Sequence, residues 1–149
     1  PKPVLMSGCL NVVEPNFDVA SIMPKVVALY RIYQKRWLAR WWQSKGVRIF
    51  VDLYTSKEFE DINLLGIPKG WSSFITKADI KDLDLLKHHY DLAKKIAEKD
   101  EITFLVYGGG KKAEQYCKDF LPKAIWFKET IDAPERDNRG AAAKLLKRK

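Results

Sequence analysis

Short runs of β-branched and aromatic residues alternate with segments of helical periodicity along the chain. A helix between two strands returns the chain to the same edge of a sheet, so the strands should run parallel. The sequence therefore predicts a three-layer α/β domain with about five mostly parallel strands flanked by helices. Strands are expected at 10–13, 47–54, 71–76, 102–107 and 124–127, with 4–6 as part of the first strand or a separate one. Helices are expected at 26–44, about 56–65, 80–98 and 112–120.

The composition is that of a globular protein with one core. Of 149 residues, 46% are hydrophobic and 31% are charged, which excludes an intrinsically disordered chain. We expect one domain over residues 1–130 and a basic, flexible tail over 131–149, where little core-forming sequence remains. No apolar stretch approaches the roughly 20 residues that cross a bilayer, so no membrane partner is expected. The two cysteines lack CxxC spacing and predict reduced thiols in the cytoplasm.

Positive charge is concentrated in two places. The chain has a formal net charge of +8, and its 33 residues between Asp18 and Asp52 include seven basic residues and no acidic one. From residue 133 to the end there are six basic and two acidic residues. Such clustering favours an anionic partner more than the total charge does.

The helix expected at 26–44 carries an aromatic stripe as well as these charges. Five residues recur at spacings of three and four, which predicts a buried face with solvated flanks: Val26, Tyr30, Tyr33, Trp37 and Trp41. Arginines beside aromatic residues also contact phosphates and stack on bases, so we predict nucleic acid, or another polyanion, as the partner. A surface for a host or virion protein, using Trp41, Trp42 and exposed arginines, is the alternative. The candidate contacts are Arg31, Lys35, Arg36, Arg40, Lys45 and Arg48, with Lys147, Arg148 and Lys149 in the tail.

A strand-to-helix junction contains three glycines followed by two lysines: Gly108, Gly109, Gly110, Lys111 and Lys112. Glycine backbone N–H groups at a helix N-terminus can approach a phosphate closely. The segment matches neither G-x-x-x-x-G-K-[ST] nor G-x-G-x-x-G, and a plain turn is the alternative. Together with Asp52, it marks the strand ends where ligands bind in parallel sheets, which raises the possibility of an enzyme or small-ligand protein.

Few other residues suggest chemistry. Asp52 follows a strand that looks buried, where it could be a general base or ligand, or could cap the next turn. His88 and His89 are adjacent on a helix, about 100° apart, and cannot easily share a metal; at least one should be solvated. Cys117 has no histidine nearby in sequence to activate it. The sequence indicates no metal and no cofactor.

Three segments together resemble a known family. They are YRIYQKRWLARWWQSKGVRIFVDLYTS, the turn GIPKGWSSF and the strand end EITFLVYGGG, which span most of the domain from about Ala28 to Gly110. This pattern is similar to that of an uncharacterised domain-of-unknown-function family encoded by bacteriophages, plasmids and other mobile elements. The resemblance implies a mobile-element origin, with the host-cell cytoplasm as location if the gene belongs to a phage. It assigns no catalytic residue. A role in replication or genome handling is therefore an expectation drawn from the basic helix and tail.

Overall fold

A single parallel sheet organises the protein in the computed structural model, which describes residues 2–17 and 19–128. The strands are β1 (Asn11–Val13), β2 (Arg48–Asp52), β3 (Ser73–Lys77), β4 (Thr103–Tyr107) and β5 (Ala124–Phe127). Neighbouring strands pair in parallel, and their order in the sheet is that of the chain. The predicted α/β class, with five parallel strands flanked by helices, is confirmed. The predicted tail at 131–149, with Lys147, Arg148 and Lys149, lies outside the described residues.

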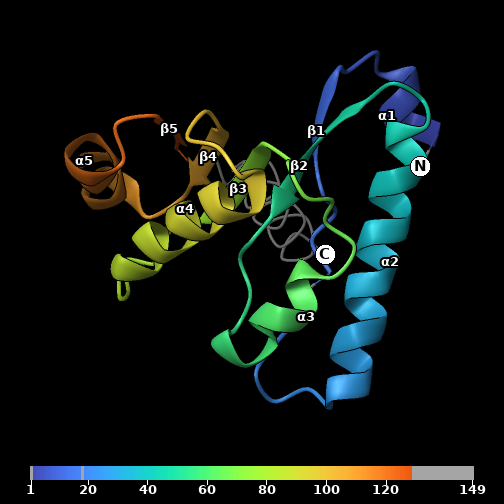
Figure 1. Ribbon diagram of the computed structural model, residues 1–149, viewed down its shortest axis with the longest axis horizontal. Coiled ribbons are helices and arrows are strands. Elements are labelled where there is room, and N and C mark those ends of the chain that lie inside the picture. The colour runs from blue at the N-terminus through green and yellow to red at the C-terminus, as the bar shows by residue number, and fades with distance from the viewer. Residues whose placement is uncertain (1, 18, 129–149) are drawn as a thin grey trace, which may run out of the picture.

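Helices connect the strands and spread along the sheet, with α2 along one side and α4 and α5 toward the other (Figure 1). Their bounds are α1 (Lys2–Met6), α2 (Lys25–Gln43), the 3₁₀ helix η1 (Lys57–Phe59), α3 (Glu60–Leu64), α4 (Asp84–Ala97) and α5 (Gly110–Phe120). Among the described residues, no helix combines the length and hydrophobicity that crossing a bilayer requires.

The largest core cluster lies between the sheet and helices α4 and α5. Phe74, Phe104 and Val106 on the strands are fully buried there, among apolar residues of both helices. Tyr90 of α4 meets the Phe104 ring edge to face, with 5.2 Å between the ring centroids. A second cluster, with Ile49 of β2, packs beneath α2. The two clusters fix the sheet as a rigid base for the strand ends.

The carboxyl ends of the strands share one edge, as expected. Asp52 is opposite Ile75, Lys77 opposite Tyr107, and Tyr107 opposite Phe127. The strand order never reverses along the sheet. Any ligand site at this edge is therefore built by the loops that follow successive strands, rather than at a switch in strand order.

Two local predictions were wrong. Residues 4–6 belong to α1 and form no strand, because only Asn11–Val13 finds a sheet partner in β2 and Pro3 suits the first turn of a helix. The helix expected from residue 80 begins at Asp84. The Asp79 carboxylate accepts a hydrogen bond from the backbone N–H of Lys81, and the Asp82 carboxylate accepts one from that of Leu85. These bonds hold the chain in turns ahead of the helix.

Candidate functional site

Helix α2 presents two different faces, and the buried one is not the face predicted from the sequence. The inward face carries the small or aliphatic residues Ala28, Ile32 and Ala39, which let the helix approach the rest of the protein closely. Tyr30, Tyr33 and Trp37 point outward and are 60%, 61% and 57% exposed. The expectation that the aromatic stripe belongs to the core is therefore wrong for these three residues, whereas Trp41 of the same stripe is partly buried against the cluster with Ile49.

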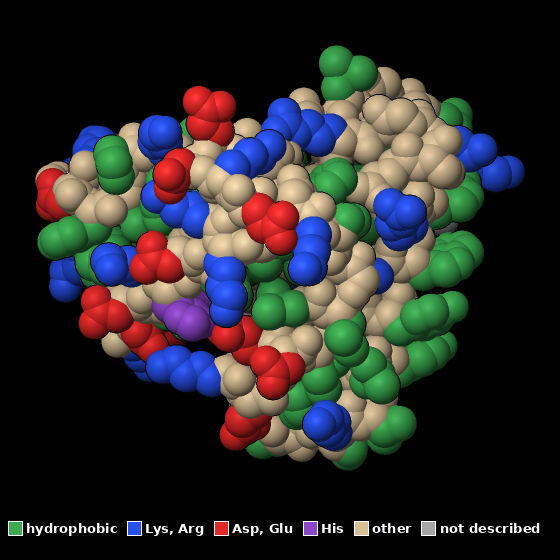
Figure 2. Space-filling model, in the orientation of Figure 1, with side chains coloured by type: hydrophobic (Ala, Val, Ile, Leu, Met, Phe, Trp, Pro, Cys, Tyr) green, Lys and Arg blue, Asp and Glu red, His purple; other side chains and the backbone are tan. Residues whose placement is uncertain are grey.

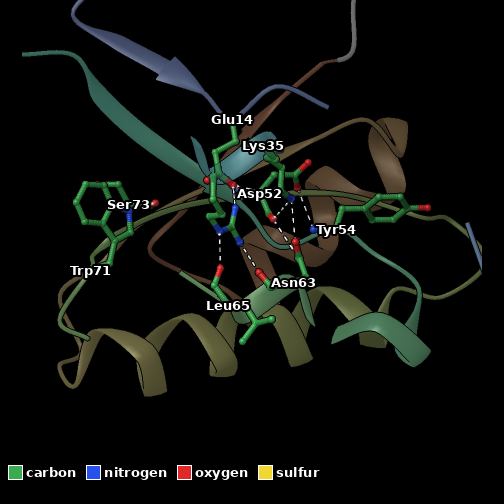
Figure 3. Close-up of polar contacts among 9 residues, drawn as sticks. Glu14, Lys35, Asp52, Tyr54, Asn63, Leu65, Trp71 and Ser73 are labelled. Atoms are coloured by element: carbon green, nitrogen blue, oxygen red, sulfur yellow. Dashed lines mark hydrogen bonds and ion pairs between the residues drawn. The ribbon is translucent and has the colours of Figure 1, made fainter. Parts of the chain in front are cut away.

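Two basic side chains of α2 lie on the buried face, in a polar network with a carboxylate (Figure 3). Arg36 forms an ion pair with Glu14, which follows β1, and also donates to the Asn63 and Leu65 carbonyls. The Glu14 carboxylate accepts a second hydrogen bond, 3.1 Å long, from the backbone N–H of Asp52. The network ties α2 to the ends of β1 and β2 and to α3.

Lys35 belongs to the same network. Its Nζ donates to the Asp52 carbonyl oxygen at 3.2 Å and to Asn63 Oδ1 at 2.8 Å, and lies 3.9 Å from a Glu14 oxygen. Burial lowers the pKa of this ammonium group, and the nearby carboxylates oppose that effect. Lys35 and Arg36 are both more than 90% buried, so these two predicted nucleic-acid contacts are wrong: they stabilise the fold.

Asp52 caps a turn, as one of its two predicted roles required; the other was that of a general base or ligand. Its Oδ1 accepts a 2.9 Å hydrogen bond from the backbone N–H of Tyr54, and only 4% of the residue is exposed. Burial raises the pKa of the carboxyl group, while Lys35 opposes the shift. No metal-binding cluster of three or more His, Cys, Asp or Glu occurs in the described part of the chain.

The exposed aromatic residues of α2 border a hollow of about 330 Å³. Figure 2 shows hydrophobic side chains along the side of the molecule formed by α2. Phe17 from the loop after β1 forms part of the wall of the hollow. The other lining residues come from α2: Tyr33, Gln34, Trp37 and Leu38. We call these five residues the aromatic hollow.

Basic residues flank the aromatic hollow on α2. Arg31 is half-buried one helical turn before Gln34, and Arg40 is exposed one turn after Trp37. Lys45 is exposed just beyond the helix. Helix α2 contains no acidic residue, so every charged side chain that it places beside the hollow is basic.

Arg48 lies apart from this surface, at the start of β2. Its guanidinium donates to Ser73 Oγ at 2.9 Å and to Thr103 Oγ1 at 3.0 Å, and lies 5.3 Å from the centroid of the Phe50 ring. These contacts crosslink three strands near their amino ends. The structure therefore does not bring Arg48 together with the basic residues of α2.

The glycine segment forms a tight turn that leads into α5. Gly108, Gly109 and Gly110 all have positive φ angles, of 78°, 68° and 60°. A Cβ atom on Gly109 would lie 2.6 Å from that of Ala113 and 2.7 Å from that of Ala78. Glycine is needed here for its backbone conformation and close packing, which supports the plain-turn interpretation.

The two lysines after this turn, Lys111 and Lys112, are exposed on the first turn of α5. The glycine segment does not line the cleft found at the carboxyl edge of the sheet. Its predicted association with Asp52 in one ligand crevice is thus not observed among the described residues.

That cleft has a volume of about 790 Å³ and lies where β2, β3 and β4 end. Lys77 and Tyr107 are the last residues of their strands; the segment 54–56 forms the loop after β2, and Lys57 begins η1. Lys35 and Ile32 of α2 line another side, next to Phe17. Phe17 therefore contributes to both the cleft and the aromatic hollow.

The histidines and the buried cysteine lie in separate surroundings. His88 is exposed and bonds Glu60 at 2.6 Å, as the expectation of one solvated histidine requires. His89 is buried and bonds Thr76 Oγ1 at 2.7 Å; burial lowers its pKa to about 4. Burial raises the pKa of the Cys117 thiol to about 11, which makes it a poor nucleophile.

Sequence reasoning missed the residues that come from loops. Glu14 was the missing partner for the basic residues of α2, but it lies 22 positions before Arg36 and nothing in the sequence links them. Thr55, Ser56 and Lys57 were visible as a polar segment after a strand, and that position was the available signal for the cleft.

Comparison with known proteins places the chain in a family. Residues 5–125 match the family described as Domain of unknown function (DUF4417). The chain belongs to this family. The match covers the whole sheet up to β5, and with it the aromatic hollow and the cleft.

Curated relatives of this DUF4417 chain come from bacteriophages. It is 26% identical over 113 residues to the Gene 1 protein of Mycobacterium phage D29, covering 73% of the chain and 40% of that protein. It is 28% identical over 97 residues to the Gene 1 protein of Mycobacterium phage L5, covering 63% of the chain and 42% of that protein. The chain thus spans about two fifths of the relatives' length. No solved structure is significantly similar to it.

Proposed function

We propose that the protein binds single-stranded nucleic acid on the outward face of α2, with one base in the aromatic hollow. The observation that carries this proposal is the hollow itself. Phe17, Tyr33 and Trp37 surround it, and Gln34 supplies an amide at its wall. Exposed apolar surface is typical of interaction sites, and a stacked base would cover the three aromatic side chains of the hollow.

Base chemistry fits this set of side chains. Stacking on aromatic rings is worth about 1–3 kcal/mol per base and tolerates any sequence, because every base has a π face. An amide group can donate to and accept from a base edge at the same time. Only an unpaired base can enter such a hollow without disrupting a duplex, and this favours single strands over double-stranded DNA.

The charges beside the hollow fit the phosphates of the same strand. Arg31 and Arg40 lie one helical turn to either side of the hollow's residues, on a helix without acidic side chains. Arginine forks bind phosphate oxygens in pairs of hydrogen bonds. Phosphate binding releases counterions, so the affinity must fall as salt is added.

Fluorescence anisotropy with labelled 20-nucleotide single strands, and with the matching duplexes, tests the proposal. We expect single-stranded DNA or RNA to bind more tightly than duplex at low salt. Trp37→Ala should weaken binding by about 5- to 150-fold, which corresponds to about 1–3 kcal/mol for one stacked base. Phe120→Ala is the matched control, because Phe120 is equally exposed, at 58%, but lies on α5.

The salt series adds a second readout. Arg40→Ala should reduce the slope of log K against log salt by about 0.7, the value for one phosphate contact on a single strand. Absence of binding to any strand at low salt, or equal effects of Trp37→Ala and Phe120→Ala, would refute the proposal.

A protein-docking function is the second candidate, and aliphatic residues on the same side of the molecule favour it. Val26 and Leu29 extend the exposed face of α2, and Ile22 before the helix is 92% exposed. Aliphatic side chains neither stack on bases nor bind phosphates, whereas protein interfaces bury them. Leu29→Ser should then abolish capture of a phage or host protein without affecting oligonucleotide affinity. If Leu29→Ser instead weakened oligonucleotide binding and left protein capture unchanged, this candidate would be rejected.

A further inference from the structure

The cleft at the carboxyl edge of the sheet provides a second, separate site. We propose that it binds a 5′-phosphorylated nucleotide, with the phosphate near Lys57 and the hydroxyl groups of Thr55 and Ser56. Its volume of about 790 Å³ lies within the range of about 300–1,000 Å³ typical of small-ligand sites. Parallel α/β sheets bind ligands at this edge.

Two hydroxyl groups in the wall of the cleft are the first observation. Thr55 Oγ1 and Ser56 Oγ are buried but have no hydrogen-bond partner among the described residues. Both residues line the cleft, directly after β2 and its turn-capping Asp52. A buried hydroxyl without a partner is costly, and a ligand oxygen supplies the missing partner. Rotation about χ1 is enough to aim each hydroxyl at such an oxygen.

Charge is the second observation. Among the described residues that line the cleft, three are lysines, Lys35, Lys57 and Lys77, and one, Asp82, carries a carboxylate. Asp82 lies 3.6 Å from the Lys57 ammonium group, and both side chains are exposed enough to separate when an anion binds. Lys35 is held by its network, where the Glu14 carboxylate lies 3.9 Å from its ammonium group, so the anion would depend mainly on Lys57. The lining therefore favours an anion such as a phosphate monoester.

Aromatic residues provide for the remainder of the ligand. Phe17, Tyr54 and Tyr107 line the same cleft, and aromatic rings stack on nucleobases. A ligand with a phosphate at one end and a flat ring at the other satisfies both halves of the site. Free mononucleotides have this chemistry, and so does the 5′-phosphorylated end of a strand. Because Phe17 also borders the aromatic hollow, a strand end could occupy both sites at once.

Isothermal titration calorimetry with adenosine and thymidine 5′-monophosphates, against the matching nucleosides, tests the site directly. We expect the monophosphates to bind and the nucleosides to bind at least about tenfold more weakly, the equivalent of about 1.4 kcal/mol. Lys57→Ala and Ser56→Ala should each weaken monophosphate binding by about tenfold. Lys123→Ala is the control, since Lys123 is an exposed lysine just before β5, at the opposite edge of the sheet.

A stability measurement on the unliganded protein separates a binding role from a structural one. Thr55→Val keeps the shape but removes one unpaired hydroxyl, so it should raise the Tm while lowering monophosphate affinity. A lower Tm with unchanged affinity would overturn the proposal. So would monophosphate binding that is undetectable, or that Lys57→Ala and Ser56→Ala leave unchanged.

Comparing 5′-phosphorylated with 5′-hydroxyl oligonucleotides distinguishes the two sources of the ligand. If the strand end is the ligand, the phosphorylated oligonucleotide binds more tightly than the 5′-hydroxyl one. Free monophosphate then removes this difference in affinity but does not affect binding of the 5′-hydroxyl oligonucleotide. If a free nucleotide is the ligand, both oligonucleotides bind alike and monophosphate still binds by calorimetry. Calorimetry measures monophosphate binding at the cleft and does not depend on oligonucleotide binding at α2. A negative result for the cleft can therefore be distinguished from a negative result for the nucleic-acid interface.

Discussion

Removing the charge of Glu14 should destabilise the protein strongly, because this carboxylate compensates two buried cations. The Glu14 side chain is 1% exposed and that of Arg36 is 10% exposed, with the ammonium group of Lys35 only 3.9 Å away. Glu14→Gln keeps the shape and one acceptor but leaves Arg36 without its ion-pair partner and Lys35 with only the Asp52 carboxyl group nearby. Breaking a buried pair from one side costs about 3–5 kcal/mol, and the retained amide places this variant near 3 kcal/mol.

Urea and thermal unfolding followed by circular dichroism measure the effect. A loss of about 3 kcal/mol corresponds to a Tm lower by about 6–12 °C for a chain of this size. Glu101→Gln is the matched control, since Glu101 is exposed before β4 and should change stability by less than about 0.5 kcal/mol. A Glu14→Gln variant within 1 kcal/mol of the wild type would refute the view that Arg36 and Lys35 act in the fold.

Three further predictions follow from single positions. Gly109→Ala should cost about 2–4 kcal/mol in urea unfolding, because its Cβ would overlap two alanine methyl groups at positive φ; Gly70→Ala, with open space around it, should cost about 1 kcal/mol. Burial lowers the pKa of His89 from 6.5 to about 4, so the unfolded chain takes up the proton first and stability falls by up to about 3 kcal/mol as the pH drops between these values. His89→Gln should remove that component from the pH profile of the unfolding free energy, and an unchanged profile would contradict it. Iodoacetamide at pH 8 should label Cys9 in the native protein and Cys117 only after denaturation, with equal labelling as the contrary result.

The sheet was predictable because its signals are local. Each strand is a short apolar run, and each connection carries a helical pattern, so the parallel arrangement followed from the chain rules for βαβ units. The misassigned strand at residues 4–6 shows where local signals end. Residues 4–6 are as apolar as a strand, but a strand needs a neighbour, and the segment before β2 that pairs with it is Asn11–Val13. The local sequence of a segment does not show which strand it will pair with.

The site was harder to predict because periodicity shows that a helix has two faces without showing which one is buried. The aromatic stripe with Tyr33 looked like core, and Lys35 looked solvated, yet the structure has them the other way round. A distant carboxylate, Glu14, made burial of the charges possible, and small residues such as Ala28 made that face the closer-packing one. Both causes depend on tertiary contacts.

Photocrosslinking of a single-stranded oligonucleotide, followed by tryptic mass spectrometry, tests the nucleic-acid interface most directly. Tyr33, Trp37 and Phe17 fall in three different tryptic peptides, 32–35, 37–40 and the peptide that ends at Lys25. We expect crosslinks to concentrate in these peptides and to disappear in 1 M salt, where phosphate contacts are screened. Crosslinks confined to the peptides of α4 or α5 would place the strand elsewhere and contradict the assignment of α2 as the binding surface.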